Sequence, residues 1–217
     1  MMIGTDMVES GTVFLIDDDP SVRDSLGLLL SLKGMPTQLF ANAESFIEAY
    51  RPEWTGCVLT DLRMPGMTGL ELQTALHARR IELPVVVLTA HGDVATARAA
   101  LKNGAFDFLE KPIDDALLLE VLGNALRIDR QRRAAATMRA SVCTRFERLT
   151  GREREILTLI TAGHQNREIA AQLGISPRTV EVHKARIMEK LECHSLAELI
   201  RVSNAADQPT AVPGRRY

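Results

Sequence analysis

Cysteine is scarce in this sequence: the only three among its 217 residues are Cys57, Cys143 and Cys193. They are odd in number and far apart, and they form neither a C-x-x-C pair nor a cluster with histidines at metal-ligand spacing. We therefore interpret them as reduced, mostly buried thiols. This composition argues against a disulfide framework and against a cysteine-ligated metal site.

Long apolar runs are missing as well. No segment reaches the roughly 18 uncharged apolar residues that a transmembrane helix requires. Residues 1–10 have neither the basic start nor the apolar core of a signal peptide. We therefore expect a soluble, cytoplasmic protein, and its 217 residues suit two domains of ordinary length.

Charge is divided unevenly along the chain, although the formal net charge is only -2. Residues 1–127 hold 10 Lys or Arg against 18 Asp or Glu, residues 128–146 hold 5 against 1, and residues 147–201 hold 9 against 8. An acidic first half is thus joined through a basic segment to a nearly neutral second half. This division suggests that only the second half meets a polyanion.

The first 127 residues alternate short β-rich runs with helical patterns, which predicts a doubly wound parallel sheet of the α/β class. The strands that we can place are almost wholly apolar, as expected for strands that helices cover on both faces. They are residues 12–16, 57–60, 84–89 and 106–109. Polar residues stand where these strands end, and ligands of doubly wound sheets bind outside the carboxyl ends of the strands. We therefore expect the polar residues to converge on one edge.

The chemistry expected at that edge is acidic. Carboxylates from Asp17, Asp18 and Asp61 would repel one another unless a cation lay among them. Mg²⁺ is the candidate, because it prefers oxygen ligands and commonly takes one or two carboxylates together with a phosphate oxygen. A remaining aspartate can then attack phosphorus and form an acyl phosphate. Lys111 would offset charge, and Thr89 would offer a hydroxyl to a phosphoryl oxygen.

Four motifs in the first half closely resemble the receiver domains of FixJ/NarL-type response regulators. They are IDDD at 16–19, TDLRMPGMTGL at 60–70, LTAHGD at 88–93 and FDFLEKP at 106–112. The resemblance covers most of residues 10–127 and implies a flavodoxin-like receiver domain with a five-stranded sheet. It also implies a sensor histidine kinase as the phosphoryl donor.

The resemblance assigns roles to individual residues. It implies that Asp61 is the phosphoryl acceptor and that Thr89 and Lys111 contact the phosphoryl group. Phe108 matches the aromatic position that turns inward when the threonine moves, although a plain core phenylalanine would fit the sequence too. A turn at 65–66 is expected to expose Asp61. The implied Mg²⁺ ligands are Asp17, Asp18, Asp61 and the backbone carbonyl of Arg63.

A helical pattern begins near residue 113, and neither Gly nor Pro interrupts it between Gly123 and Gly151. We therefore expect residues 128–146 to form a helical linker. Apolar residues at seven-residue spacing would form one stripe on a continuous helix, which fits either a short parallel coiled coil or a solvated linker helix. Residues 207–217 are expected to be a disordered tail. The stripe consists of Val121, Ile128, Ala135, Val142 and Leu149.

The second half carries the signals of three helices. Thr150 and Glu153 form a capping box before an apolar run. Asn166 can cap a second helix, which Gly174 ends in a left-handed turn. A Ser-Pro pair at 176–177 then opens a third helix. Helix, glycine-containing turn and helix make the spacing of a DNA-binding helix-turn-helix, an all-α unit whose second member enters the major groove.

The third helix has two different faces. Val180, Ile187 and Leu191 have inward spacing. The outward face fits base readout between phosphate contacts, although a solvated helix of mixed charge would look similar. Residues 166–191 resemble the output domain of the same regulators, also called LuxR-type, across 147–206, which implies promoter DNA as a partner. The outward residues are Arg178, Glu181, Val182 and Ala185, flanked by Thr179, Lys184, Arg186 and Lys190.

The resemblance also implies pairing of receivers. It places the contact on a helix at 93–103 and the strand at 106–109, where Ala97, Ala100 and Leu101 offer apolar positions. We therefore expect phosphorylation to promote a homodimer that binds promoter DNA, with RNA polymerase as a further partner left open. An alternative is that phosphorylation releases an inhibitory contact between the domains without dimerisation.

Two other functions fit the sequence less well. A phosphate-sink interaction module would leave residues 166–191 without a purpose. A metal-dependent phosphatase would need catalytic residues in the second half, which offers none. The sequence also lacks a G-x-x-x-x-G-K-[ST] loop, which excludes an ATP-driven transcription activator. We therefore expect no enzyme activity other than the chain's own Mg²⁺-dependent aspartyl phosphorylation and dephosphorylation.

Overall fold

A five-stranded parallel sheet organises the first of the two units into which the chain divides, Met1–Arg133 and Ala134–Tyr217. The structure is a computed structural model and describes residues 11–90 and 101–207. The strand order β2-β1-β3-β4-β5 is that of a doubly wound, flavodoxin-like sheet, so the predicted fold class is confirmed. The strands are β1 (Thr12–Ile16), β2 (Thr37–Phe40), β3 (Gly56–Asp61), β4 (Val85–Thr89) and β5 (Asp107–Glu110).

The strands differ from the sequence-based expectation in four places, of which the simplest is that β3 is one residue longer at each end than the expected 57–60. The β2 strand was not located from the sequence, because it has only four residues and only Phe40 among them is buried. The β4 strand begins at Val85, because Pro84 has no N–H to donate to the ladder, although its carbonyl accepts from Val58. The β5 strand is shifted by one residue and ends at Glu110.

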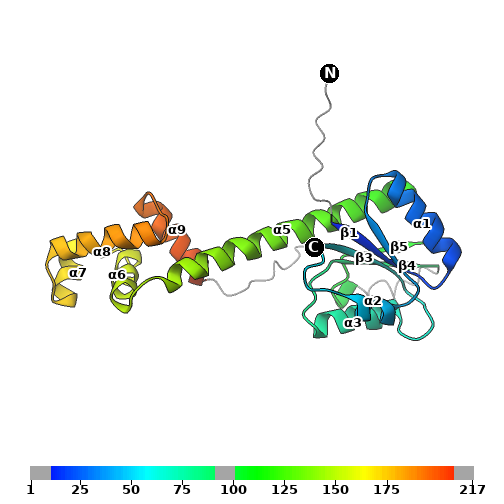
Figure 1. Cartoon of the computed structure of the whole chain (residues 1–217), viewed down its shortest axis with the longest axis horizontal. Coiled ribbons are helices and arrows are strands. Elements are labelled where there is room, and N and C mark those ends of the chain that lie inside the picture. The colour runs from blue at the N-terminus through cyan, green and yellow to red at the C-terminus, as the bar shows by residue number, and fades with distance from the viewer. Residues whose placement is uncertain (1–10, 91–100, 208–217) are drawn as a thin grey trace, which may run out of the picture. The chain divides into compact units, whose positions relative to one another are not determined.

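Helices cover both faces of the sheet, and each face has its own hydrophobic core (Figure 1). One face carries α1 (Pro20–Leu32) and the first part of α5 (Asp115–Glu147), with Leu30, Leu118 and Leu122 fully buried. The other face carries α2 (Ala43–Ala49) and α3 (Gly69–Ala78). Two-sided burial holds the strands in place, so the residues that follow them are fixed as well.

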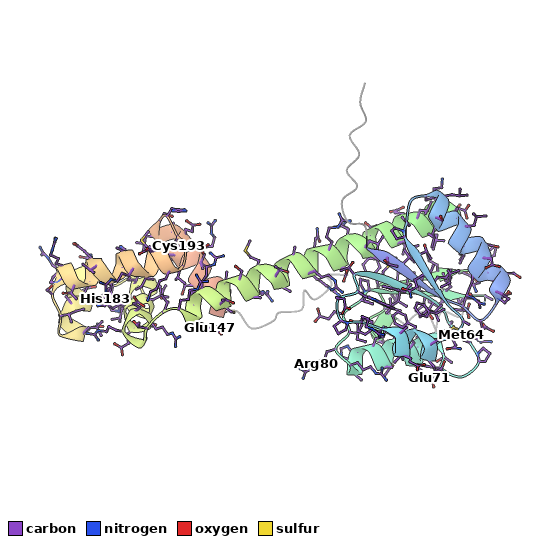
Figure 2. All side chains as sticks on the ribbon, in the orientation of Figure 1. Met64, Glu71, Arg80, Glu147, His183 and Cys193 are labelled. Carbon is purple, nitrogen blue, oxygen red and sulfur yellow. The ribbon has the colours of Figure 1, made fainter. Side chains whose placement is uncertain are left out.

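Helix α5 is continuous over 33 residues, which agrees with the uninterrupted helical pattern. It ends at Glu147, labelled in Figure 2, so the expected stripe through Leu149 does not lie on one helix. Val121 is buried in the core that α1 and α5 share, and Leu149 is buried in the core of the second unit. The prediction of a continuous apolar stripe is therefore wrong, because its members serve separate cores.

Up to residue 207, the second unit contains helices and no strand, as predicted. A capping box between Thr150 and Glu153 opens α6, and Ser176 caps α8. Gly174 ends α7 with φ 63, the left-handed turn expected there. The second helix differs, because its N-cap is Gln165 rather than Asn166. The helices are α6 (Gly151–Thr161), α7 (Asn166–Leu173), α8 (Pro177–Lys190) and α9 (Leu196–Asp207).

The structure shows the state of the three cysteines and the apolar length of the described helices. All three cysteines are free thiols: Cys57 and Cys193 are buried, whereas Cys143 is exposed. Within residues 11–90 and 101–207, no helix is both long and apolar enough to cross a bilayer.

Candidate functional site

Two carboxylates and one ammonium meet at the carboxyl edge of the sheet. Asp17 directly follows β1, Asp61 ends the neighbouring strand β3, and Lys111 follows β5. The Nζ atom of Lys111 lies 2.9 Å from Oδ2 of Asp17 and 2.5 Å from Oδ1 of Asp61. Lys111 therefore bridges two acidic groups that lie 94 and 50 positions away in the sequence. The sheet topology alone brings these three side chains together.

The second oxygen of each carboxylate is bound by a backbone amide. Asp17 Oδ1 accepts from the N–H of Asp19 at 2.9 Å, and Asp61 Oδ2 accepts from the N–H of Arg63 at 2.7 Å. Asp17 is 1% exposed and Asp61 is 8% exposed. The expectation that the following turn exposes Asp61 is therefore wrong, because Lys111 and the Arg63 amide bind both of its oxygens. Buried charges of this kind persist only when they are paired and hydrogen-bonded.

Lys111 is held in its charged form. Its burial favours the neutral amine, but hydrogen bonds to Asp17 and Asp61, together with their negative charges, outweigh burial and raise the pKa of Lys111 above its usual value. The site therefore contains a permanent cation at neutral pH. Such a cation can offset negative charge that gathers on an incoming group.

The remaining residues predicted for this site lie around the cluster. Asp18 and Arg63 are exposed. Thr89 ends β4 and is 2% exposed, and its carbonyl accepts from the N–H of Lys111 at 2.6 Å. Val87 pairs with Phe108 across β4 and β5, and both contribute to the same core. Because side chains alternate along a strand, Thr89 points to the same face as Val87 and the half-buried Phe108.

Mg²⁺ has suitable donors here. The two carboxylates beside Lys111 offer oxygen ligands, and Mg²⁺ commonly binds through one or two carboxylates while it keeps several waters. Asp17 and Asp61 supply the carboxylates, and exposed Asp18 stands next to them. In the part of the chain that the structure describes, no set of three or more His, Cys, Asp or Glu side chains is gathered closely enough to hold a metal. The three carboxylates that the sequence predicts as Mg²⁺ ligands therefore do not form a preassembled metal site among the described residues.

Two residues near the site were missed by the sequence analysis. The guanidinium of Arg23 donates to the Asp17 carbonyl at 2.6 Å. Glu44, in the first turn of α2, accepts from the N–H of Met67 at 2.9 Å and so holds the loop after β3. Gly66 in this loop has φ 78, and a Cβ atom there would lie 2.7 Å from Glu44 Oε1. No motif signals either contact, since both depend on the tertiary fold.

The residues predicted for receiver pairing are only partly described. Ala97 and Ala100 lie outside the described residues. Leu101 is half-buried near the end of a helix, and the β5 strand that follows is an edge strand of the sheet. Their role in dimerisation stays a prediction.

Helix α8 presents the polar face that its sequence predicts. Val180, Ile187 and the adjoining Leu191 are fully buried in the core of the second unit. Val182 is 45% exposed, although it is apolar. The exposed members of the predicted face are Arg178, Glu181, Val182, Ala185 and Arg186, whereas Thr179, Lys184 and Lys190 are half-buried. One helix therefore supplies a continuous surface on which basic, acidic and apolar groups alternate.

Lys190 has a second task that the sequence did not reveal. Its Nζ atom lies 2.6 Å from Oε2 of Glu153, and the same oxygen accepts from the N–H of Thr150 at 2.8 Å. Glu153 is 3% exposed, and its burial favours the neutral acid. The hydrogen bonds from Lys190 and Thr150 outweigh this effect and lower the pKa of Glu153. The capping box of α6 is thereby tied to the last residue of α8.

His183 lies on α8 and is labelled in Figure 2. Its ring is half-buried, and its Nδ1 atom is buried with no hydrogen-bond partner among the described residues. A buried ring nitrogen of this kind is usually satisfied by water or by a binding partner.

Comparisons with known proteins match both units. The family described as the response regulator receiver domain matches residues 13–123, and the luxR family of bacterial regulatory proteins matches residues 147–203. The chain is 44% identical over 197 residues to the transcriptional regulatory protein FixJ of Azorhizobium caulinodans, covering 91% of this chain and 93% of FixJ. It is 40% identical to the C4-dicarboxylate transport transcriptional regulatory protein DctR of Rhodobacter capsulatus, covering 89% and 100%.

Solved structures show the same similarity. The response regulator StyR has a TM-score of 0.83 and 42% identity, covering 90% of this chain and 98% of StyR. Full-length FixJ from B. japonicum has a TM-score of 0.57 and 39% identity, covering 90% and 97%. The similarity therefore extends over both units rather than over the sheet domain alone.

Proposed function

The chain belongs to the response regulators that join a receiver domain to a LuxR-family DNA-binding domain and regulate transcription, and on this premise we propose that phosphorylation of Asp61 controls promoter binding by α8. The observation that carries the proposal is the buried cluster of Asp17, Asp61 and Lys111 at the carboxyl edge of the sheet. The proposed domains are a receiver at 10–127, a linker at 128–146 and a DNA-binding domain at 147–206.

The proposed reaction is phosphoryl transfer from a histidine of a sensor kinase to Asp61. A carboxylate oxygen of Asp61 forms the new bond to phosphorus as the bond from phosphorus to the histidine nitrogen breaks. Lys111, already beside Asp61, offsets the charge on the phosphoryl oxygens. The Thr89 hydroxyl donates to one of these oxygens. The side chains proposed to contact the phosphoryl group thus stand at the ends of β3 and β4 and in the segment after β5.

Mg²⁺ is the proposed cofactor, held by Asp17, Asp18, Asp61 and the carbonyl of Arg63. When bound, it neutralises charge on the transferring group. Asp18 tests this role because it is exposed, so its substitution leaves the buried pair intact. Asp18→Asn should lower both Mg²⁺ affinity and phosphoryl labelling by about tenfold. Labelling that falls while Mg²⁺ affinity stays unchanged would remove Asp18 from the metal site.

A hollow of about 330 Å³ lies beside Lys111, next to the proposed phosphoacceptor site. It lies between the first turns of α1 and the segment that follows β5, and Val22, Leu26 and Ile113 give it apolar walls. A donor histidine must approach Asp61 closely, so the donor protein has to rest on the surface around the site. We propose that this hollow receives the kinase.

The proposed output is a change in receiver pairing. Phosphate on Asp61 draws Thr89 inward, and Phe108 follows on the same face of the sheet. This reshapes the surface near β5, where Leu101 lies, and favours a homodimer. Two helix-turn-helix units linked in this way gain affinity for paired half-sites about one DNA turn apart.

Sedimentation and operator binding of the full chain, with and without the phosphoryl mimic beryllofluoride, test this proposal together. We expect the mimic to convert monomer to dimer and to raise operator affinity, and Asp61→Asn to remove both effects. Asp24→Asn, an exposed aspartate on α1, is the matched control and should behave as wild type. A monomer that gains operator affinity would instead support release of an inhibitory interdomain contact. Dimerisation without any DNA binding would support a phosphate sink.

A further inference from the structure

A second buried ion pair lies at the amino edge of the sheet, at the end of β3 away from Asp61. The carboxylate of Asp129 on α5 is 5% exposed. Its Oδ2 atom accepts from the backbone N–H of Gly56, the first residue of β3, at 2.9 Å. The two residues are 73 positions apart. The carboxylate therefore joins α5 to the strand that carries the proposed phosphoacceptor.

Arg133, one helical turn later, completes this arrangement. Its Nε atom lies 3.1 Å and 2.9 Å from the two carboxylate oxygens of Asp129, and its Nη2 atom donates to the carbonyl of Trp54. The ring of Trp54 in turn stacks on Phe14 of β1, with centroids 4.8 Å apart and planes 9° apart. We call Asp129 and Arg133, with their bonds to Gly56 and Trp54, the α5 clamp.

The α5 clamp binds the sheet at Gly56, where β1 and β3 are tightly packed. Gly56 has φ 144, and a Cβ atom there would lie 1.8 Å from the carbonyl oxygen of Thr12. Thr12 pairs with Gly56 in the sheet, and its N–H donates to the carbonyl of Thr55 at 2.8 Å. The backbones of β1 and β3 therefore leave no room for a side chain at Gly56, where Asp129 binds. Only glycine fits this close approach.

Directly after Arg133, the residues of α5 are no longer packed against the receiver. The first unit ends at Arg133, and residues 134–141 of α5 are all exposed. We propose that the α5 clamp fixes the direction in which the helix leaves the receiver, so that Asp129 and Arg133 are positioning residues for the DNA-binding half. Without the clamp, the last core residue of α5 would be Leu126, seven residues and about 10 Å earlier along the helix.

The regulatory consequence rests on the proposed function. A linked pair of DNA-binding units gains affinity only if the link holds the second unit near its half-site. A clamp that shortens the exposed stretch of α5 therefore increases the gain in DNA affinity that follows receiver pairing. The mechanical claim, in contrast, holds whether or not Asp61 is phosphorylated, so the two can be tested separately.

The cysteine distribution suits a distance measurement on the full chain. Cys143 is exposed and lies ten residues beyond Arg133. Cys57 and Cys193 are buried, and burial, followed by the Asp129 charge, raises the pKa of Cys57 to about 12. Spin labels should therefore attach to Cys143 and to a cysteine added at the exposed position in Ser31→Cys on α1. The distance distribution between the two labels reports how firmly α5 is held.

We expect a narrow distribution for the clamped chain. Asp129→Ala should roughly double its width, because it removes both the bond from Gly56 and the ion-pair partner of Arg133. Arg133→Ala should widen the distribution less, because the bond from Gly56 to Asp129 remains. Arg133→Lys should restore part of the narrowing, since it keeps the charge beside Asp129. Arg130→Ala, an exposed arginine on the same helix, is the matched control and should leave the width unchanged. If Asp129→Ala fails to fold, the half-exposed Arg133 carries the test.

Widths equal to wild type in the clamp variants, or a width already broad in wild type, would overturn the proposal. A second measurement compares operator affinity with and without beryllofluoride. In Arg133→Ala the gain should fall by about tenfold while phosphoryl labelling of Asp61 stays at the wild-type level. If the gain in operator affinity with beryllofluoride is unchanged in Arg133→Ala, the claim that the clamp contributes to regulation is wrong. If wild type itself shows no gain, the proposed function fails, whereas the label distances still decide the clamp.

Discussion

The polar residues proposed to carry function are arranged differently in the two halves of the protein. In the receiver, Asp17, Asp61 and Lys111 are drawn from distant parts of the chain and are largely buried against one another. In the DNA-binding half, α8 alone provides the polar face, and most of it is exposed. A buried cluster depends on all of its members, whereas an exposed face is a set of nearly independent contacts. We therefore expect all-or-none effects in the first half and graded effects in the second.

Loss of Lys111 should give the largest effect. Lys111→Met leaves two buried carboxylates without their cation and removes the charge that offsets the phosphoryl group. We expect acetyl phosphate labelling of Asp61 to fall by about 10²–10³-fold, the usual cost of losing such a group. Operator binding without phosphorylation should be unchanged, and Lys102→Met, at an exposed lysine, is the control. Labelling within a factor of about two of wild type would show that the cluster is not a unit.

Glu181 should affect only base preference. As an exposed residue of α8 it can accept from a cytosine amino group, so Glu181→Ala should relax selection at one base pair by about 1–3 kcal/mol. Binding to a set of operators with single substitutions measures this. Glu189→Ala, at another exposed glutamate of the same helix, should leave the preferences intact. Uniform weakening over all operators would mean that Glu181 does not read a base.

The two lysines of α8 should separate a DNA contact from a structural pair. Lys184→Ala should weaken binding to every sequence and reduce the log-log salt slope by about 1. Lys190 is bound to Glu153, so Lys190→Ala should lower the free energy of unfolding by about 1–2 kcal/mol and change the slope less. Binding isotherms across salt and urea unfolding give both quantities. An equal loss of slope in the two variants would place Lys190 at the phosphate backbone as well.

The smallest effect concerns acid stability of the second half. The pKa of Glu153 is lowered in the folded protein, so its contribution is present above the unfolded pKa and is lost as pH falls through the folded value. Wild type should therefore lose stability as pH drops below about 4.3, the usual value for a glutamic acid, and Glu153→Gln should show a flatter profile. Glu155→Gln, at an exposed neighbour, is the control. Urea unfolding followed by circular dichroism across this pH range makes the comparison.

The sequence predicted best what depends on neighbours along the chain. The apolar runs of β1, β3 and β4 and the capping box at Thr150 are local signals, and the structure contains all of them. The meeting of Asp61 with Lys111 could also be anticipated, because strand ends converge in a doubly wound sheet. The four-residue β2 strand gave too little pattern to be located.

What the sequence could not predict depends on specific long-range contacts. Asp129 and Arg133 look like any charged pair on a linker helix, yet Asp129 is buried against Gly56. Lys190 looks like a phosphate contact, yet it binds Glu153. In both cases the spacing along the helix is informative about the face, but not about the partner across the fold. The same limit explains why the stripe from Val121 to Leu149 was wrong.

Because α5 is one uninterrupted helix, the number of residues in the linker sets how far the segment that follows is rotated about the helix axis. Each residue inserted into an α-helix turns everything after it by about 100° and advances it by about 1.5 Å. Insertions within the exposed stretch at 134–141 disturb no core. The rotation of the following segment about the helix axis and its distance along that axis can therefore be varied there almost separately. Two extra residues would swing the following segment by about 200° for only about 3 Å of length, whereas seven would return it to within about 20° of its original bearing and add about 10 Å. Linker length in this protein can therefore change with least disturbance in steps of about one heptad.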